Sequence, residues 1–185
     1  MEILHYEERA LENTEYSGCT FVKCVFANMT MRNVTFSNCV FEECSLRNVT
    51  FRECSMVNGA FLKCVLMGLD WSVMRRHGTR LSVLWKMPSC AVRYNTFVNM
   101  KMGKMDFSGS SLHDCYFQEC ECKQADFRAC DLENTVFQNC NLSKADFRDA
   151  RNYRINVLNN TVAKAKFSQP DVMGLLCGFD IVIEP

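Results

Sequence analysis

Large apolar residues recur at every fifth position along most of the chain, although an α-helix repeats about every 3.6 residues and a β-strand about every two. In the segment ADFRACDLENTVFQNCNLSKADFRDA, the recurring residues are Phe127, Leu132, Phe137, Leu142 and Phe147. The same interval holds over 16–71 and again over 97–147, shifted by one residue and weakened only at Cys122. Such a repeat predicts a solenoid, in which each unit buries its apolar side chains only against neighbouring turns.

The position two residues before each large residue is also restricted. If the large residue is i, position i−2 is mostly Cys, Ala, Thr, Val or Met, which are small or medium side chains. The other three positions of each unit are more often polar, as at Arg128, Asn134 and Gln138. Each unit is therefore predicted to point a large and a small side chain inward and to expose the rest.

The units ADFRA, CDLEN, CNLSK and ADFRD match the approximate consensus A(D/N)LXX of the pentapeptide-repeat family, which the chain resembles over 16–71 and 92–150. The resemblance implies an all-β fold, a right-handed quadrilateral β-helix (solenoid) in which four units form one coil of 20 residues. The number of units then predicts about six coils, interrupted once and closed by a short C-terminal helix/strand cap.

Breaks in the repeat divide the chain into five predicted segments. These are an N-terminal cap segment (1–15), a first repeat block (16–71), a basic interruption (72–91), a second repeat block (92–150) and a C-terminal cap and dimerisation module (151–185). Within the last segment, Pro170 and Asp171 are suited to the start of a helix. We expect a short helix over VMGLLCGF and a short strand over DIVIE.

The C-terminal segment is more apolar than the cap of a monomer requires. Its tail resembles that of family members in which a C-terminal module mediates dimerisation, which favours a homodimer over a monomeric cap. The predicted dimer interface consists of Met173, Leu175, Leu176, Phe179, Ile181 and Ile183.

Thirteen cysteines are many for 185 residues, but eleven of them occupy the i−2 position or its equivalent. Cysteine behaves as a small buried residue, and the spacings lack the CxxC pairs typical of metal sites. We therefore predict core cysteines and no metal. Many free thiols indicate a reducing cytoplasm, and neither a signal peptide nor a membrane-spanning run is apparent. A cytoplasmic protein without a membrane partner is expected.

No pattern typical of catalysis is present. The sequence lacks a Ser/His/Asp arrangement, a Gly-rich phosphate loop and an HExxH motif. His5, His77 and His113 are scattered, and solvation at the surface is expected for each. Because a β-helix of this kind offers flat faces rather than a deep pocket, the sequence predicts a protein that is not an enzyme and needs no cofactor.

The basic residues are concentrated near the interruption. The chain has 21 basic and 21 acidic residues and a formal net charge of zero, which predicts no direct contact with nucleic acid. Residues 72–105 nevertheless contain seven basic residues and no acidic residue. The predicted partner-contacting residues of the interruption are Arg75, Arg76, Arg80, Trp85 and Lys86. The alternative is a tolerated insertion with solvated charges.

Acidic residues are concentrated in the second repeat block, where 106–150 contains nine acidic and four basic residues. In coils of 20 residues, Asp106, Asp126 and Asp146 would stack into one outward column, about 4.8 Å apart. Arg128 and Arg148 would run beside this column and partly neutralise it. The predicted acidic contact surface comprises Asp106, Glu121, Asp126, Asp131 and Asp146.

Two functions are consistent with these patterns. The chain resembles the Qnr, MfpA and microcin B17-immunity type of family members, which interact with DNA gyrase or topoisomerase IV as DNA mimics. This resemblance implies a protein partner and protection of that enzyme from quinolones or toxins. The alternative is a general protein–protein interaction scaffold with an unrelated partner, which could use the outward apolar patch of Val22, Val40 and Leu62.

Overall fold

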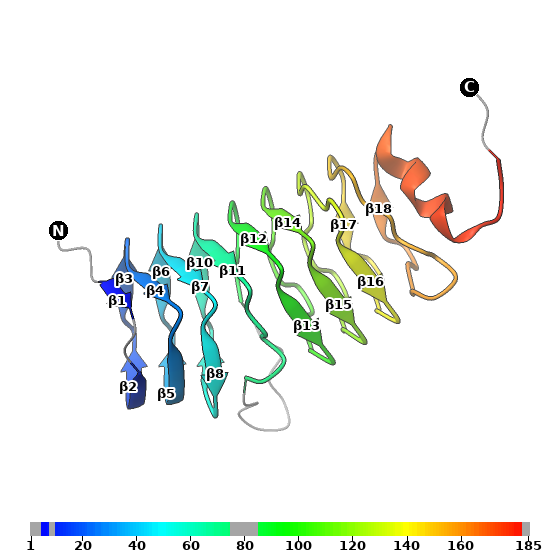
Figure 1. The fold of residues 1–185 in the computed structure, drawn as a ribbon. Coiled ribbons are helices and arrows are strands. Elements are labelled where there is room, and N and C mark those ends of the chain that lie inside the picture. The colour runs from blue at the N-terminus through cyan, green and yellow to red at the C-terminus, as the bar shows by residue number, and fades with distance from the viewer. Residues whose placement is uncertain (1–4, 8–9, 75–84, 183–185) are drawn as a thin grey trace.

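The protein is a rod of stacked coils (Figure 1), seen here in a computed structural model that describes residues 5–7, 10–74 and 85–182. Its parallel β-solenoid has about seven turns and one short helix at the C-terminal end. Strand pairing begins at His5–Glu7 and continues beyond residue 150 to Lys166–Phe167. The rod is therefore slightly longer than the six coils estimated from the repeat.

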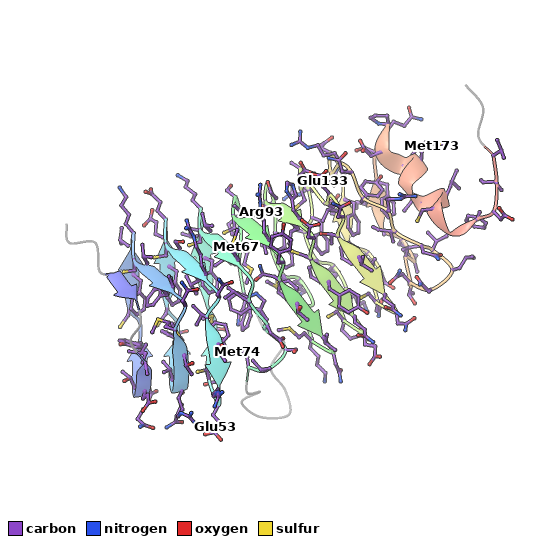
Figure 2. All side chains as sticks on the ribbon, in the orientation of Figure 1. Glu53, Met67, Met74, Arg93, Glu133 and Met173 are labelled. Atoms are coloured by element: carbon purple, nitrogen blue, oxygen red, sulfur yellow. The ribbon has the colours of Figure 1, made fainter. Side chains whose placement is uncertain are left out.

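Short parallel strands line the sides of the rod. The first side, face 1, contains β1 (His5–Glu7), β4 (Val25–Ala27), β7 (Ser45–Arg47), β11 (Val65–Met67), β12 (Ala91–Arg93) and β14 (Ser111–His113). The next two sides, faces 2 and 3, share β2 (Leu11–Ser17) and β5 (Thr30–Ser37), because these strands run around a corner. Figure 2 shows outward side chains along the rod, including Met67 and Arg93, which are paired neighbours on face 1.

The remaining strands complete the four sides. Face 2 also contains β8 (Thr50–Arg52), β13 (Thr96–Val98), β15 (Tyr116–Gln118) and β16 (Val136–Gln138), and face 3 contains β9 (Ser55–Val57). The fourth side, face 4, contains β3 (Thr20–Val22), β6 (Val40–Glu42), β10 (Ala60–Leu62), β17 (Asp146–Phe147) and β18 (Lys166–Phe167). Isolated bridges such as Asp106↔Asp126 continue the stacking where no strand is formed.

The interruption adds residues to a single coil without breaking the stack. Ala60 pairs with Val40 on one side and with Lys86 on the other. Stacked residues are 20 apart within each block but 26 apart across the interruption. Because 26 is one more than a multiple of five, this extra length accounts for the one-residue shift between the two repeat blocks. Regular stacking on face 4 resumes at Lys86, which also bridges to Asp106.

The core is a set of stacked columns of the large residues at i. On face 4, the ring centroids of Phe107 and Phe127 are 5.1 Å apart, and those of Phe127 and Phe147 are 4.8 Å apart. The rings are almost parallel, and all three side chains are fully buried. The alternation of inward and outward positions predicted from the sequence is therefore confirmed in these coils.

Most corners are formed by a residue at i+2 with a positive φ angle. Asn28, Asn38 and Asn48 are examples, with φ between 49° and 53°. This left-handed conformation is unfavourable for most side chains but is tolerated by asparagine, whose short polar side chain can form local hydrogen bonds. Asn48 donates to the Asn28 side chain, 3.1 Å away in the next coil. The frequent Asn at i+2 is therefore a sequence signal for the corners, which the apolar pattern alone did not reveal.

The inward residue at i−2 also forms hydrogen bonds, which its small size does not by itself indicate. The Cys64 thiol donates to the Phe41 carbonyl (3.2 Å), and the Cys130 thiol donates to the Phe107 carbonyl (3.0 Å). Thr135 donates to the equivalent Leu112 carbonyl at 2.6 Å. A donor at i−2 therefore gives a buried carbonyl of the preceding coil a hydrogen-bond partner, although the Phe107 carbonyl also accepts from the Ser110 backbone N–H at 3.0 Å.

Burial keeps the thiols of Cys115 and Cys130 protonated. Eleven cysteines are buried, Cys19 is partly buried, Cys177 is exposed, and all thirteen are free. Desolvation raises the pKa of the Cys115 and Cys130 thiols to about 12. These thiols are neutral near pH 7 and remain available as hydrogen-bond donors. The predicted core position of the cysteines is confirmed, and the hydrogen bonds are an additional reason for that residue type.

The last coil is covered by the 3-10 helix η1 (Asp171–Gly178). The helix lies close to the chain at Tyr153, because a Cβ atom at Gly174 would overlap the Tyr153 carbonyl oxygen. The Asp171 carboxylate accepts a hydrogen bond from the Asn152 backbone N–H at 3.0 Å. The helix predicted over VMGLLCGF is therefore present, whereas residues 180–182 of DIVIE form no strand.

Candidate functional site

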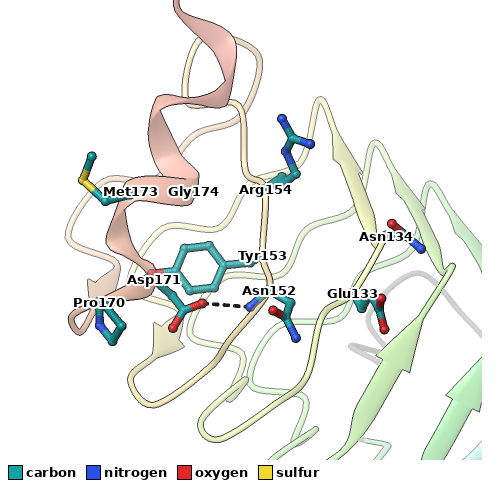
Figure 3. A pocket seen from close by; sticks show the side chains of 9 residues that line it. All are labelled: Glu133, Asn134, Asn152, Tyr153, Arg154, Pro170, Asp171, Met173 and Gly174. Carbon is teal, nitrogen blue, oxygen red and sulfur yellow. Dashed lines mark hydrogen bonds between the residues drawn. The ribbon is translucent and has the colours of Figure 1, made fainter. Parts of the chain in front are cut away.

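The described coils carry shallow grooves near their C-terminal end, including one of about 400 Å³ lined by Val136 and Asn156 and another beside η1. This second groove, of about 460 Å³, lies between the last coils and η1 (Figure 3). Its lining residues are Glu133, Asn134, Asn152, Tyr153, Arg154, Pro170, Asp171, Met173 and Gly174. Across residues 5–7, 10–74 and 85–182, no three His, Cys, Asp or Glu side chains are grouped so that they could hold a metal ion. The candidate functional sites are therefore surfaces rather than cavities.

Asp106, Asp126 and Asp146 stack in one column on face 4, as their 20-residue spacing predicts. In the backbone stack, Lys86 forms a β-bridge with Asp106, and Lys166 is the strand partner of Asp146. The acidic column is thus bounded by a lysine at each end, which the sequence analysis did not anticipate.

Arginines neutralise much of the column. The Arg128 guanidinium donates to both Asp126 carboxylate oxygens, with Nε at 2.9 Å from Oδ1 and Nη2 at 2.6 Å from Oδ2. Arg148 holds Asp146 in the same manner, and Lys166 Nζ is 3.8 Å from Asp146 Oδ2. The hydrogen bonds from these arginines lower the pKa of both aspartates. The partial neutralisation predicted for the column is confirmed.

The other two predicted acidic residues lie elsewhere. Glu121 is on face 3 and accepts a hydrogen bond from the Asn141 side chain at 2.9 Å. Asp131 is on face 1, where Arg151 Nη2 is 3.0 Å and His113 Nε2 is 3.4 Å from Asp131 Oδ2. The five acidic residues therefore do not form one continuous surface.

The surroundings of Asp131 differ from those expected for a solvated carboxylate. Its side chain is only 14% exposed, and that of His113 only 17%. Burial by itself would raise the pKa of Asp131, but hydrogen bonds from Asn152 and Arg151 lower it overall. His113, which we expected at the surface, is thus largely covered and faces a carboxylate. Two residues 18 positions apart in the chain meet here because successive coils stack.

The interruption is described only at its ends. Arg75, Arg76 and Arg80 lie outside the described residues. Lys86 is exposed, as expected for a contact residue. Trp85 is 1% exposed, forms an edge-on contact with the Trp71 ring at 5.2 Å and donates to the Met56 carbonyl at 3.3 Å. The interpretation of Trp85 as a partner-contacting residue is therefore wrong, because its ring fills the core where the coil is irregular.

The C-terminal cap exposes much of its apolar surface. Met173 is 49%, Phe179 44% and Ile181 54% exposed, and Figure 2 shows the Met173 side chain at the outer surface of η1. Leu175 and Leu176 are partly buried. Ile183, the last residue of the predicted dimer interface, lies outside the described residues. Within η1 no side chain is fully buried, so the helix covers the last coil while leaving an apolar outer side.

The predicted apolar patch is located on face 4 of the first repeat block. Val22, Val40 and Leu62 belong to three stacked strands and are partly buried. Val22 and Leu62 lie in one outward column with Glu42 between them, whereas Val40 lies in the neighbouring column, where it pairs with Thr20 and Ala60. This patch is smaller than a continuous apolar face.

The fold and its surfaces define the class of protein as a β-solenoid of pentapeptide units. The sequence matches the profile described as a pentapeptide repeat region over residues 6–82 and 91–167. The chain belongs to the pentapeptide-repeat family. No curated protein matches the sequence significantly.

Solved structures of the same family show the same fold. A trypsin-treated variant of QnrB1, described as a plasmid-mediated fluoroquinolone resistance protein, matches with a TM-score of 0.72 and 14% identity, over 94% of this chain and 87% of that one. HetL from the cyanobacterium Nostoc sp. strain PCC 7120, involved in heterocyst differentiation regulation, matches with a TM-score of 0.52 and 15% identity, over 84% of each chain. Within the described ranges, no helix is long and apolar enough to cross a membrane.

Proposed function

We propose that this chain is a non-enzymatic, cytoplasmic protein that binds a type II topoisomerase, DNA gyrase or topoisomerase IV, and protects it from quinolones or toxins. The observation that supports this proposal most directly is the extent of the structural match to the fluoroquinolone resistance protein QnrB1, which includes 94% of the chain. The flat faces suit a large protein partner, and the buried free thiols are typical of a reducing compartment.

The charges support only a partial resemblance to DNA. Asp126, Asp146 and Asp131 are paired with arginines, whereas Asp106 accepts hydrogen bonds only from Ser108 among its described contacts. Asp114 lies next to the coil of Glu133, whose carbonyl accepts from the Asp114 backbone N–H at 3.0 Å. The Asp114 and Glu133 side chains are exposed and form no ion pair with a described residue. In this proposal they provide negative charge in addition to the face 4 column.

Gyrase supercoiling assays with and without ciprofloxacin test this proposal. The unmodified protein is expected to restore supercoiling in the presence of the drug or to inhibit the enzyme directly. The triple variant D106N/D126N/D146N should lose part of this effect and part of its salt sensitivity, because charge steering depends on ionic strength.

A matched control is E15Q/E42Q/E43Q, which removes one acidic residue from the N-terminal cap segment and two from the first repeat block. It should retain the full effect. Equal activity of the two triple variants would show that the face 4 column is not the basis of binding. If neither type II enzyme is inhibited, protected or captured by the unmodified protein, the topoisomerase proposal is wrong.

We further propose that the chain is a homodimer that associates through the C-terminal cap. The exposed Met173, Phe179 and Ile181 would be buried in such a dimer, which removes apolar area from water. Sedimentation equilibrium at micromolar protein should give twice the chain mass of 21.3 kDa. The variant F179D/I181D should sediment as a monomer, whereas Y94D, at a side chain 59% exposed on the rod, should remain dimeric. A 21.3 kDa species for the unmodified protein contradicts the dimer.

A second candidate function is a general protein-interaction scaffold. The observation in its favour is the partly exposed apolar patch of Val22, Val40 and Leu62 in the first repeat block, away from Asp106, Asp126 and Asp146. A partner that uses this apolar patch would be insensitive to D106N/D126N/D146N. Its binding should instead be lost when Val40 and Leu62 are changed to serine.

A further inference from the structure

The residues stacked along one corner of the rod change from glycine and asparagine to mostly lysine halfway along its length. This corner column lies between faces 3 and 4, at the i+2 position of each face 3 unit. In the first repeat block it contains Gly18, Asn38 and Asn58. In the second block it contains Lys104, Gln124 and Lys144, and it continues to Lys164 in the coil that follows. Backbone hydrogen bonds establish the stacking, since Lys104 N–H donates to the Lys123 carbonyl and Lys144 N–H donates to the Ala163 carbonyl, both at 2.9 Å.

Lysine at this corner does not serve the fold. Lys104, Lys144 and Lys164 have φ angles of 62°, 59° and 58°, a conformation that is less favourable for lysine than for glycine or asparagine. Asn38 and Asn58 stabilise the same corner in the first block, because their side chains form a hydrogen bond of 3.0 Å. The three lysines are exposed, and none forms an ion pair or side-chain hydrogen bond with a described residue.

Further lysines flank this column. We call the whole set the lysine ridge, which comprises Lys101, Lys104, Lys123, Lys144, Lys164 and Lys166. All six side chains are exposed. Lys101 lies on face 3, where its backbone forms a β-bridge with Glu121 in the next coil. Lys123 precedes the corner residue Gln124. The ridge therefore extends over four successive coils, about 14 Å at the usual strand spacing.

The acidic residues beside the ridge are Asp106, Glu121, Asp126 and Asp146, and most of them are already engaged. Arg128 and Arg148 pair with Asp126 and Asp146 at 2.6 Å. Glu121 accepts from Asn141, and Lys166 is 3.8 Å from Asp146. Six lysines and two arginines thus lie near four carboxylates, so this edge of the rod is positive even though the second repeat block is acidic overall.

We propose that the lysine ridge binds the phosphodiester backbone of a nucleic acid, without reading its sequence. A straight row of flexible cations fits the regular negative charge of a duplex, which carries one charge about every 1.7 Å along its axis. A protein partner is a poorer fit, because lysine is depleted at protein interfaces and these need aromatic or apolar anchors. Face 3 beside the ridge instead exposes small residues, such as Gly103, Ser143 and Ala163.

This inference goes beyond the proposed function and changes the expectation drawn from the net charge. A net charge of zero predicts no attraction to nucleic acid only if positive and negative charges are mixed over the surface. Here six of the nine lysines are exposed along one corner, and Lys166 is the one of these six that pairs with a described carboxylate, while Asp114 and Glu133 are exposed at another corner. The ridge does not require a topoisomerase, so its failure and that of the proposed function can be distinguished.

Fluorescence polarisation with the full chain and no topoisomerase tests the ridge. The probes are a labelled 20-base-pair DNA duplex and single strands of DNA and RNA, at 50 mM NaCl. The unmodified protein should bind the duplex, and K104N/K144N/K164N should bind at least about tenfold more weakly. The slope of log K against log salt should fall by about two to three, because each phosphate contact contributes about 0.9 for a duplex.

Asparagine is chosen because Asn38 and Asn58 occupy the same corner, so the variant should fold with unchanged or higher stability. For a matched comparison, K144N/K164N should weaken binding, whereas K23N/K63N, two corner lysines with φ of 54° in the first block, should not. Equal effects of these double variants, or no binding of any nucleic acid by the unmodified protein, would overturn the proposal. Binding to poly-L-glutamate but to none of the nucleic acids would also overturn it, in favour of an acidic protein partner.

Discussion

Replacing Phe127 with alanine is expected to lower the free energy of unfolding by about 3–5 kcal/mol, the usual cost of deleting a buried phenylalanine side chain. Phe127 is fully buried and stacks between Phe107 and Phe147, at centroid distances of 5.1 and 4.8 Å. It also meets the Phe117 and Phe137 rings edge-on. The cavity would therefore remove contacts in three coils, and neighbouring coils provide each other's only core.

Urea denaturation followed by circular dichroism measures this loss, and K123A provides the control. The Lys123 side chain is exposed and forms no ion pair or hydrogen bond with a described residue, so its replacement should change the free energy of unfolding by less than about 0.5 kcal/mol. If F127A and K123A unfolded at the same urea concentration with equal slopes, the stacked ring column would not be the source of stability.

Replacing Asn95 with leucine is expected to lower the free energy of unfolding by about 2–5 kcal/mol, although leucine is apolar and Asn95 is only 1% exposed. The Asn95 carboxamide accepts a hydrogen bond from the Trp71 indole at 2.8 Å. It donates to the Leu66 carbonyl at 2.8 Å and to the Arg93 carbonyl at 2.7 Å. Leucine would leave the Trp71 N–H and the Leu66 carbonyl buried without partners, each at about 1–3 kcal/mol.

Threonine at position 95 provides the matched comparison. Thr135 occupies an equivalent i−2 position and donates to the Leu112 carbonyl, so N95T should recover the bond to Leu66 but not that to Trp71. Its stability should lie between those of N95L and the unmodified protein when the variants are compared by urea denaturation. Equal stability of all three proteins would mean that these buried hydrogen bonds contribute nothing measurable.

The alternation of inward and outward residues could be predicted because it depends only on positions within one unit. A five-residue interval places Phe127 and Ala125 inward, whatever the neighbouring coils contain. The stacking of Asp106, Asp126 and Asp146 followed from the 20-residue coil implied by the family, and the bridges between them confirm it. The nearby Arg128 and Arg148 also paired as expected, since each lies two residues from its aspartate.

The features that could not be predicted depend on contacts between coils. Trp85 looks like an exposed residue of a basic loop, but the irregular coil turns its ring toward Trp71 in the core. His113 sits at an outward position, yet stacking brings it against Asp131 in the next coil and covers both. Neither outcome is visible in the apolar pattern, because that pattern records direction relative to the core and not the identity of the stacked neighbour.

The sequence alone determined the solenoid, its two repeat blocks and the buried position of the cysteines, because the spacing of apolar residues dictates which side chains must leave water. Only the tertiary structure decided how the outward charges are arranged. Coil closure and the longer coil at the interruption set which residues become neighbours, 20 or 26 positions apart. Stacking therefore neutralises much of the acidic column and places six of the nine lysines of an electrically neutral chain along one ridge.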